Sequence, residues 1–194
     1  MPAQPVTAAI LAGGQARRFG GRDKSRLVVD GRSIIVRQVD VLQRVAAEVL
    51  VIASDTDRFA DLGLAVHADV IPGAGAMGGL YTALEAASST LVIVVACDLP
   101  FLEAAVLERL IELASTGDGA WVRLADRIEP LLACYRRDVR TTIRREILAG
   151  RLKLGDLGST LDMAELDGAE LSRFGPPARL LANINTPDDY ARIQ

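Results

Sequence analysis

Short apolar runs that alternate with helical patterns constrain the fold of this 194-residue chain more than any other feature. Val6–Leu11, Val49–Ala53 and Leu91–Ala96 are continuous apolar stretches of strand length, as expected of buried strands, and Leu64–Val66 is a weaker one. Strands that alternate with helices predict an α/β fold with a parallel sheet covered on both faces. The predicted helices are Ser33–Ala47 with Ser33 as N-cap, Gly79–Ala87, Glu103–Ala114 and Asp138–Leu148.

The pattern changes after residue 116. Ala120–Leu124 and Leu131–Tyr135 predict two strands joined by a polar turn, hence an antiparallel element. Leu180–Ile184 predicts a late strand, and Pro187 fits the first turn of a last helix. We predict one domain over residues 1–194, a three-layer Rossmann-like, mostly parallel sheet with one antiparallel element. Residues 1–115 form its nucleotide-binding half, and residues 116–194 complete the sheet.

Three loops lie where ligands of such a sheet bind. Right-handed crossovers bring the carboxyl ends of parallel strands to one edge, and ligands bind along that edge. Ala12–Arg26, Asp69–Gly78 and Cys97–Phe101 leave this edge, each with polar or glycine residues directly after an apolar strand.

Composition excludes several classes of function. A formal net charge of −3 is less basic than a nucleic-acid-binding domain usually is. His67 is the only histidine, which excludes a His-rich zinc site. Cys97 and Cys134 form no CxxC pair, so we expect a cytoplasmic protein. No run of 18 apolar residues and no basic start before the first apolar segment occur, so we expect neither a membrane span nor a signal peptide.

The segment LAGGQARRFGGRDKSR gathers positive charge on one glycine-rich loop. Gly13 and Gly14 allow a sharp turn that brings backbone N–H groups close to a ligand. Together with arginine and lysine side chains they would form a cradle for a triphosphate; the alternative is a solvated basic loop. Lys24-Ser25 does not follow a glycine directly, so the loop is not a Walker A motif. The cations of the loop are Arg17, Arg18, Arg22, Lys24 and Arg26.

Asp98 ends the most apolar strand and has two interpretations. It could cap the helix predicted near Glu103, or it could hold Mg²⁺ between itself and substrate phosphates. Asp98 also lies 20 residues after the last glycine of Gly73-x-Gly75-x-x-Gly78, which satisfies the dinucleotide fingerprint. The segment before these glycines is a poor strand that ends in proline, so we do not favour a dinucleotide site.

These motifs together resemble one family. LAGGQARRFGGRDK, Asp69 before GAMGG, VACDLPFL and the late NINTPDD resemble the molybdenum cofactor guanylyltransferases, which are MobA-like nucleotidyltransferases, over nearly the whole chain. The resemblance implies a fold of the nucleotide-diphospho-sugar transferase type. It also implies Mg-dependent transfer of GMP from GTP to the terminal phosphate of molybdopterin that carries molybdenum, with pyrophosphate as the second product.

The resemblance also implies residue roles. The backbone of Leu11, Ala12 and Gly13 would meet the guanine nucleotide. Lys24 would contact the triphosphate, with Arg18 and either Arg17 or Arg22 also stabilising the departing pyrophosphate. The remaining assignments are Asp69 to the nucleotide, Asp98 to the Mg²⁺ ion, and Asn183 and Asn185 to the acceptor side, which is residues 116–194.

Other functions stay open at this stage. The nearest alternative is a sister enzyme, either a CTP-dependent molybdopterin cytidylyltransferase or a sugar-phosphate or polyol-phosphate nucleotidyltransferase. An NAD-binding oxidoreductase and a non-catalytic cofactor-handling protein are alternatives from other classes. Partners beyond GTP and molybdopterin would be molybdopterin-delivery proteins or an apo-molybdoenzyme with its chaperone, and we expect neither nucleic acid nor a membrane.

Overall fold

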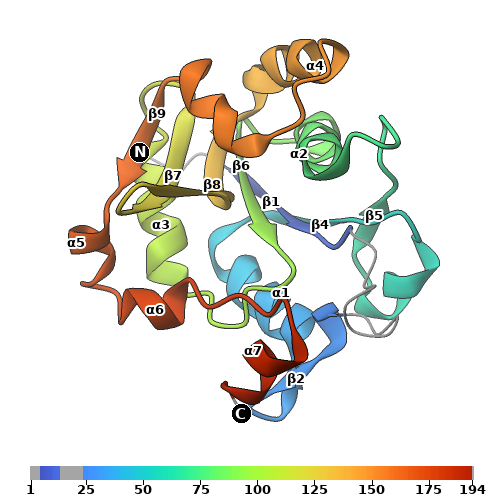
Figure 1. Ribbon diagram of the computed structural model, residues 1–194. Helices are drawn as coiled ribbons and strands as arrows, with labels where there is room; N and C mark the ends of the chain where they lie inside the picture. The colour runs from blue at the N-terminus through green and yellow to red at the C-terminus, as the bar shows by residue number, and fades with distance from the viewer. Residues whose placement is uncertain (1–4, 14–23, 194) are drawn as a thin grey trace.

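The computed structural model describes residues 5–13 and 24–193, and its centre is a seven-stranded sheet in the order β5-β4-β1-β6-β8-β7-β9 (Figure 1). A two-stranded hairpin, β2-β3, forms a second, small sheet. The strands of the large sheet are β1 (Val6–Leu11), β4 (Glu48–Ile52), β5 (Ala65–His67), β6 (Leu91–Ala96), β7 (Gly119–Leu124), β8 (Arg127–Arg136) and β9 (Met163–Leu166), and the hairpin is β2 (Val28–Val29) and β3 (Arg32–Ser33).

The direction of the strands agrees with the sequence. β8 runs antiparallel to both of its neighbours, β6 and β7, while the other four pairings of the large sheet are parallel. The predicted mostly parallel sheet with one antiparallel element is therefore confirmed. In the register of the central strands, Leu11 pairs with Ile52 on one side and with Ala96 on the other. The carboxyl ends of β1, β4 and β6 thus meet at one edge.

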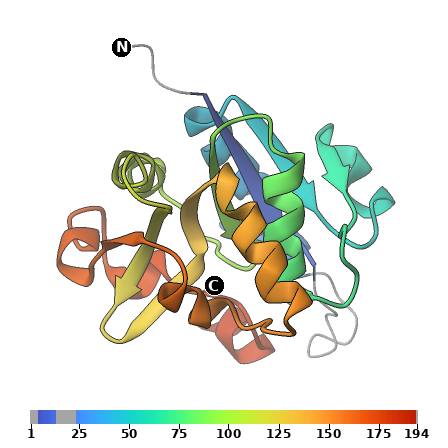
Figure 2. The ribbon, with the colours of Figure 1, turned by 90° about the horizontal axis from the view of Figure 1, so that it is seen from above.

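Helices cover both faces of the sheet. Alternate residues of β1 point to opposite faces: Ala8 and Ile10 join the core beneath α1 and α3, and Ala9 and Leu11 join the core beneath α2 and α4. Figure 2 shows α2 and α4 side by side on their face. The helices are α1 (Ile34–Val45), α2 (Gly75–Ala86), α3 (Ala104–Leu113), α4 (Arg140–Leu148), α5 (Gly168–Leu171), α6 (Pro177–Leu180) and α7 (Pro187–Ala191).

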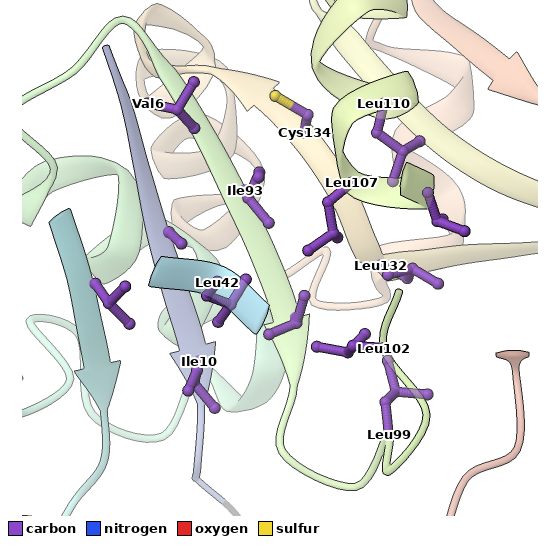
Figure 3. Packing of buried hydrophobic residues seen from close by; sticks show 14 of the residues in the cluster. Val6, Ile10, Leu42, Ile93, Leu99, Leu102, Leu107, Leu110, Leu132 and Cys134 are labelled. Carbon is purple, nitrogen blue, oxygen red and sulfur yellow. The ribbon is translucent and has the colours of Figure 1, made fainter. Parts of the chain in front are cut away.

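The core beneath α1 and α3 is built from branched aliphatic side chains. Figure 3 shows Ile10 of β1 and Ile93 of β6 facing Leu42 of α1 and Leu107 of α3, and all four are fully buried. Only 4% of the residues are aromatic, so this aliphatic packing supplies most of the apolar area that holds the layers together. The helix predicted after Ser33 is present. Ser33 occupies its N-cap position in an extended conformation, but its side chain makes no capping hydrogen bond.

The predicted late strand Leu180–Ile184 is wrong. Pro177 begins the short helix α6, which ends at Leu180, and the following residues pair with no strand. Ile184 is instead buried against a third cluster that includes Val29 and Phe101, and its backbone N–H donates to the carbonyl oxygen of Asp98 at 3.1 Å. The apolar run reflects this burial rather than a strand.

Other element boundaries also differ from the predictions: β8 begins at Arg127 rather than Leu131, and α4 begins at Arg140 rather than Asp138. The helix expected over Gly79–Ala87 begins at Gly75, which shortens the preceding loop. Residues 151–171, which the sequence left unassigned, contain a 3₁₀ turn at Leu154–Ser159, then β9 and α5. The last helix is as predicted: Pro187 lies in the first turn of α7, and Thr186 and Asp189 form a capping box. Within residues 5–13 and 24–193, no helix has the length and apolar character needed to cross a membrane.

Candidate active site

A cleft of about 310 Å³ opens at the edge where β1, β4 and β6 end. Such an edge is the usual ligand site of an open α/β sheet. The cleft is bounded by the ends of these three strands, the first turns of α2 and one residue of β8. Its lining consists of Leu11, Gly13, Ile52, Asp69, Gly75, Ala76, Gly79, Ala96, Cys97, Asp98 and Leu131.

Backbone hydrogen bonds continue the sheet beyond the formal strand ends and fix the floor of the cleft. The N–H of Ala12 donates to the carbonyl of Ile52 at 2.8 Å, and the N–H of Cys97 donates to the carbonyl of Leu11 at 3.2 Å. The segments that follow β1 and β6 are therefore held side by side. Gly13 is exposed beside them, and among the described residues a Cβ atom there would meet nothing within 4 Å.

Glycines let α2 approach the cleft closely. A Cβ atom on Gly79 would lie 3.3 Å from Cδ1 of Leu11 and 3.8 Å from a carboxylate oxygen of Asp69, so even an alanine there would require the Leu11 side chain to shift by a few tenths of an ångström. Gly75, at the start of the helix, has φ +59, which favours glycine. Gly75 and Ala76 line the cleft, and no side chain caps the helix at Ala74. The amino end of a twelve-residue helix thus borders the cleft and favours negative charge there.

Asp98 lies in the turn directly after β6 and lines the cleft. Burial raises the pKa of its carboxyl group, and the positive charge of Lys24 opposes that rise. The alternative interpretation, that Asp98 caps the next helix, is wrong, because Glu103 occupies the N-cap position of α3. The carboxylate of Asp98 is therefore available to a ligand.

Lys24 and Asn185 come together although 161 positions separate them in the chain. The ammonium Nζ of Lys24 donates a 2.9 Å hydrogen bond to Oδ1 of Asn185. The backbone N–H of Asn185 donates to a carboxylate oxygen of Asp189. This bond anchors the backbone of Asn185 to the capping box of α7. The N–H of Ile184, the residue before Asn185, donates to the carbonyl of Asp98 at 3.1 Å, which holds this pair beside the cleft although neither Lys24 nor Asn185 lines it.

Of the sequence-predicted site residues, Leu11, Gly13, Asp69 and Asp98 line one cleft, and Ala12 is buried beside Leu11. Burial raises the pKa of the Asp69 carboxyl group. The remaining predicted residues divide into three groups. Lys24 and Asn185 form the pair described above, Asn183 is half-buried outside the cleft lining, and Gly14, Arg17, Arg18 and Arg22 lie outside the residues that the structure describes.

Glu129 is a second acidic group at this edge that the sequence did not single out as a site residue. Burial raises the pKa of its carboxyl group, the Arg127 guanidinium opposes that rise, and the negative charge of Asp98 adds to it. The Nε of Arg127 lies 2.9 Å from Oε1 of Glu129. Glu129 lies three residues before Leu132 on β8, and Leu132 pairs with Val95 near the end of β6. Only this pairing, which is invisible in the sequence, brings Glu129 toward Asp98.

The residues that the structure describes contain no cluster of three or more His, Cys, Asp or Glu side chains that could hold a metal ion by themselves. The carboxylate of Asp98 could instead share a hard cation with the phosphates of a substrate. Mg²⁺ is commonly held in this way, by one or two carboxylates plus phosphate oxygens.

The chain is similar to nucleotidyltransferases in sequence and in structure. The model of the MobA-like NTP transferase domain matches residues 8–159. A probable molybdenum cofactor guanylyltransferase from Chloroflexus aggregans is 36% identical over 192 residues, covering 95% of this chain and 91% of the relative. The crystal structure of molybdopterin-guanine dinucleotide biosynthesis protein A from Archaeoglobus fulgidus superimposes with a TM-score of 0.81 at 26% identity, covering 96% of each chain.

A more distant structure shows how widely the fold is shared. The 4-diphosphocytidyl-2C-methyl-D-erythritolsynthase of Anaerococcus prevotii superimposes with a TM-score of 0.73 at 13% identity, covering 98% of this chain and 94% of that one. This likeness concerns the fold alone. The dinucleotide interpretation of Gly73, Gly75 and Gly78 gains no support, because β5 ends at His67 and five residues separate it from the first of these glycines.

Proposed function

This chain belongs to the MobA-like NTP transferases and, among them, to the molybdenum cofactor guanylyltransferases, and we propose that it works with Mg²⁺ at the cleft bounded by Asp98. It transfers GMP from GTP to the terminal phosphate of molybdopterin that carries molybdenum. The products are molybdopterin guanine dinucleotide and pyrophosphate. Its fold is that of the nucleotide-diphospho-sugar transferases.

The observation that carries the site assignment is the convergence of Asp98, Lys24 and Asn185 at one edge. Lys24, from the segment after β1, donates to Asn185, from the segment before α7, and the N–H of the neighbouring Ile184 donates to the carbonyl of Asp98 after β6. A polyphosphate needs cations around it, and its transfer needs an acceptor beside it. This trio supports a nucleotide on the Lys24 side and the acceptor on the Asn185 side.

The nucleotide would be bound mainly by backbone and by charge. The backbone of Leu11, Ala12 and Gly13 would contact the guanine nucleotide at the end of β1, and Asp69, which lines the same cleft, would also contact it. The amino end of α2 adds a favourable potential for phosphate. Gly14 and Arg18 belong to the same predicted site, with Arg18 and Lys24 stabilising the charge that develops on the pyrophosphate.

The transfer requires no nucleophilic side chain. A phosphate oxygen of the acceptor forms a bond to the α-phosphorus of GTP, and the bond from that phosphorus to the bridging oxygen breaks, leaving its electron pair on pyrophosphate. The attacking oxygen is already ionised near neutral pH, so no general base is needed. Asp98 would hold the Mg²⁺ ion, which offsets repulsion between the two polyanions. The protein's part is to orient the reactants and balance their charge.

The two halves of the chain would divide this work. Residues 1–115 contain Lys24, Asp69 and Asp98 and would bind the nucleotide, whereas residues 116–194 contain Asn183 and Asn185 and would bind molybdopterin. The 2.9 Å bond between Lys24 and Asn185 connects the two proposed subsites. Because Asn183 belongs to the half that would bind molybdopterin, its loss is expected to weaken acceptor binding more than GTP binding.

A thermal-shift comparison tests the nucleotide. GTP, CTP, ATP and NAD⁺ are each added with and without Mg²⁺, and a ligand at ~100 times its Kd should add about 2.7 kcal/mol to the free energy of unfolding. We expect the largest rise in Tm with GTP and Mg²⁺. A rise with CTP in place of GTP would indicate the sister cytidylyl activity, and a rise with NAD⁺ alone would contradict the proposal.

Asp98→Asn tests the metal assignment. The amide keeps the shape of the carboxylate but removes its charge, so we expect a folded protein that loses the Mg²⁺-dependent part of the Tm rise and its release of pyrophosphate with the molybdopterin acceptor. Asp138→Asn makes the same chemical change at an exposed aspartate paired with Arg136, and it should behave like the wild type. Wild-type turnover by Asp98→Asn would exclude Asp98 as the metal ligand.

A further inference from the structure

A buried glutamine on α1 binds the turn that carries Asp98. The side-chain Nε2 of Gln38 donates two hydrogen bonds, to the carbonyl oxygen of Ala96 at 2.8 Å and to that of Leu99 at 2.9 Å. Gln38 is only 1% exposed. Its amide therefore joins the last residue of β6 to the residue just after Asp98, with Cys97 and Asp98 between the two bonds.

The orientation of this amide is fixed by chemistry. Two carbonyl oxygens can only be satisfied by an NH₂ group, so Oε1 of Gln38 must point the other way. Within the described part of the chain, this buried Oε1 has no hydrogen-bond partner. A buried, unpaired acceptor disfavours folding, so an apolar residue of similar size would suit the packing of α1 better. The two hydrogen bonds to the turn offset the cost of this unpaired oxygen.

The same turn is held from two other directions. The N–H of Cys97 donates to the carbonyl of Leu11 at 3.2 Å, and the N–H of Ile184 donates to the carbonyl of Asp98 at 3.1 Å. Leu99 is packed into the core beneath α1, where Figure 3 shows it near Leu102. The backbone is therefore tied on both sides of Asp98, which itself lines the cleft.

We propose that Gln38 is a positioning residue that sets the direction of the Asp98 carboxylate for the metal ion shared with the nucleotide. The inference rests on the proposed function, in which Asp98 holds that ion. Gln38 touches neither the cleft nor the substrate, and it acts by fixing the carbonyls of Ala96 and Leu99. Groups that orient a metal ligand in this way commonly change metal affinity by roughly 10- to 100-fold when they are removed.

Gln38→Met tests the proposal, because methionine keeps the length and volume of the side chain but cannot donate to the two carbonyls. Gln38→Asn is a second variant, since it keeps an amide that is too short to reach them. Leu42→Ala is the matched control: Leu42 is a fully buried residue one turn further along α1, and its loss weakens the core without touching the turn.

Two measurements separate positioning from general destabilisation. Hydrogen exchange reports on the amides of Cys97 and Ile184, which should exchange faster in the two Gln38 variants than in Leu42→Ala. Isothermal titration of GTP at rising Mg²⁺ concentration, without acceptor, should show a roughly 10- to 100-fold higher Mg²⁺ requirement in the Gln38 variants. Affinity for GTP in the absence of Mg²⁺ should match the wild type.

Asp98→Asn, titrated in the same way, keeps the inference distinct from the proposed function. If Asp98→Asn loses the Mg²⁺ dependence while Gln38→Met and Gln38→Asn keep the wild-type requirement, the positioning role is overturned and the metal assignment stands. If Asp98→Asn keeps the wild-type Mg²⁺ dependence, the metal assignment fails and the positioning role fails with it. Unchanged exchange at Cys97 and Ile184 in both Gln38 variants would overturn the structural step by itself.

Discussion

Lys24 and Asn185 are predicted to act as a coupled pair. Their hydrogen bond is 2.9 Å long and charge-assisted, a type of bond that contributes about 1.5–3 kcal/mol. When GTP is bound, we expect Lys24 to make a bond of the same kind to phosphate. Lys24→Ala should therefore lower kcat/KM for GTP about 10- to 150-fold, since 1.4 kcal/mol corresponds to a factor of ten.

The second half of this prediction concerns the double variant. If Asn185 orients Lys24, then Asn185→Ala removes part of what Lys24 contributes, and the two losses overlap. We expect the double variant to retain at least about five times more activity than the product of the single effects, a coupling of about 1 kcal/mol. The alanine at position 185 keeps its backbone bond to Asp189, so α7 should remain capped.

The assay is steady-state pyrophosphate release with GTP and the molybdopterin acceptor varied in turn. Lys153→Ala is the matched control. It also removes the positive charge of a lysine, but Lys153 is 80% exposed, pairs with Asp156 and belongs to none of the proposed subsites, so we expect less than a twofold change. Single effects that multiply in the double variant would refute the coupling and assign Lys24 and Asn185 independent roles.

Three further predictions concern stability. Leu107→Ala, in the core beneath α3, should lower the free energy of unfolding in urea by about 2–5 kcal/mol, whereas Leu148→Ala, 72% exposed, should change it by less than about 0.5 kcal/mol; equal effects would contradict the packing. Because burial raises the pKa of Asp69 above its ordinary 3.8, the folded state binds that proton more tightly, so stability should fall as pH rises from about 3.8 through the folded-state pKa. Asp69→Asn should flatten this part of a urea series measured at several pH values, and an unchanged slope would contradict it. Thr186→Ala should remove the hydroxyl that accepts a hydrogen bond from the N–H of Asp189, and should lower the stability of α7 by about 1 kcal/mol. The loss is measured as faster hydrogen exchange at that amide, and unchanged exchange would show that the cap does not hold α7.

The first half of the fold was predictable because parallel strands buried on both faces leave continuous apolar runs. Val6–Leu11 and Leu91–Ala96 were predicted with the boundaries that the structure has. Their shared edge follows from the handedness of crossovers, which predicts from the sequence that Asp69 and Asp98 lie on one side of the sheet. Local sequence pattern and the rules of topology are sufficient to predict the fold where each strand or helix has a clear hydrophobic pattern of its own.

The remainder of the site depends on contacts between distant parts of the chain. Nothing near Leu180–Ile184 distinguishes a strand from an extended loop that is buried against Phe101, so the strand prediction failed there. Gln38 looks like an ordinary polar residue on an amphipathic helix, and only the position of α1 beside the turn shows what it binds. Glu129 was not predicted as a site residue, because its approach to Asp98 depends on the pairing of β8 with β6.

The bond from Ile184 to the carbonyl of Asp98 has a consequence for the order of events during synthesis. β1, β4 and β6 can pair once residue 96 has emerged from the ribosome, and domains form from the amino end as the chain is elongated. The turn after β6 and the ammonium group of Lys24 nevertheless wait for partners at positions 184 and 185. A nascent chain would thus pair these three strands for some time before it could hold GTP, and stalled chains in which residue 185 has or has not emerged from the ribosome should differ in nucleotide binding.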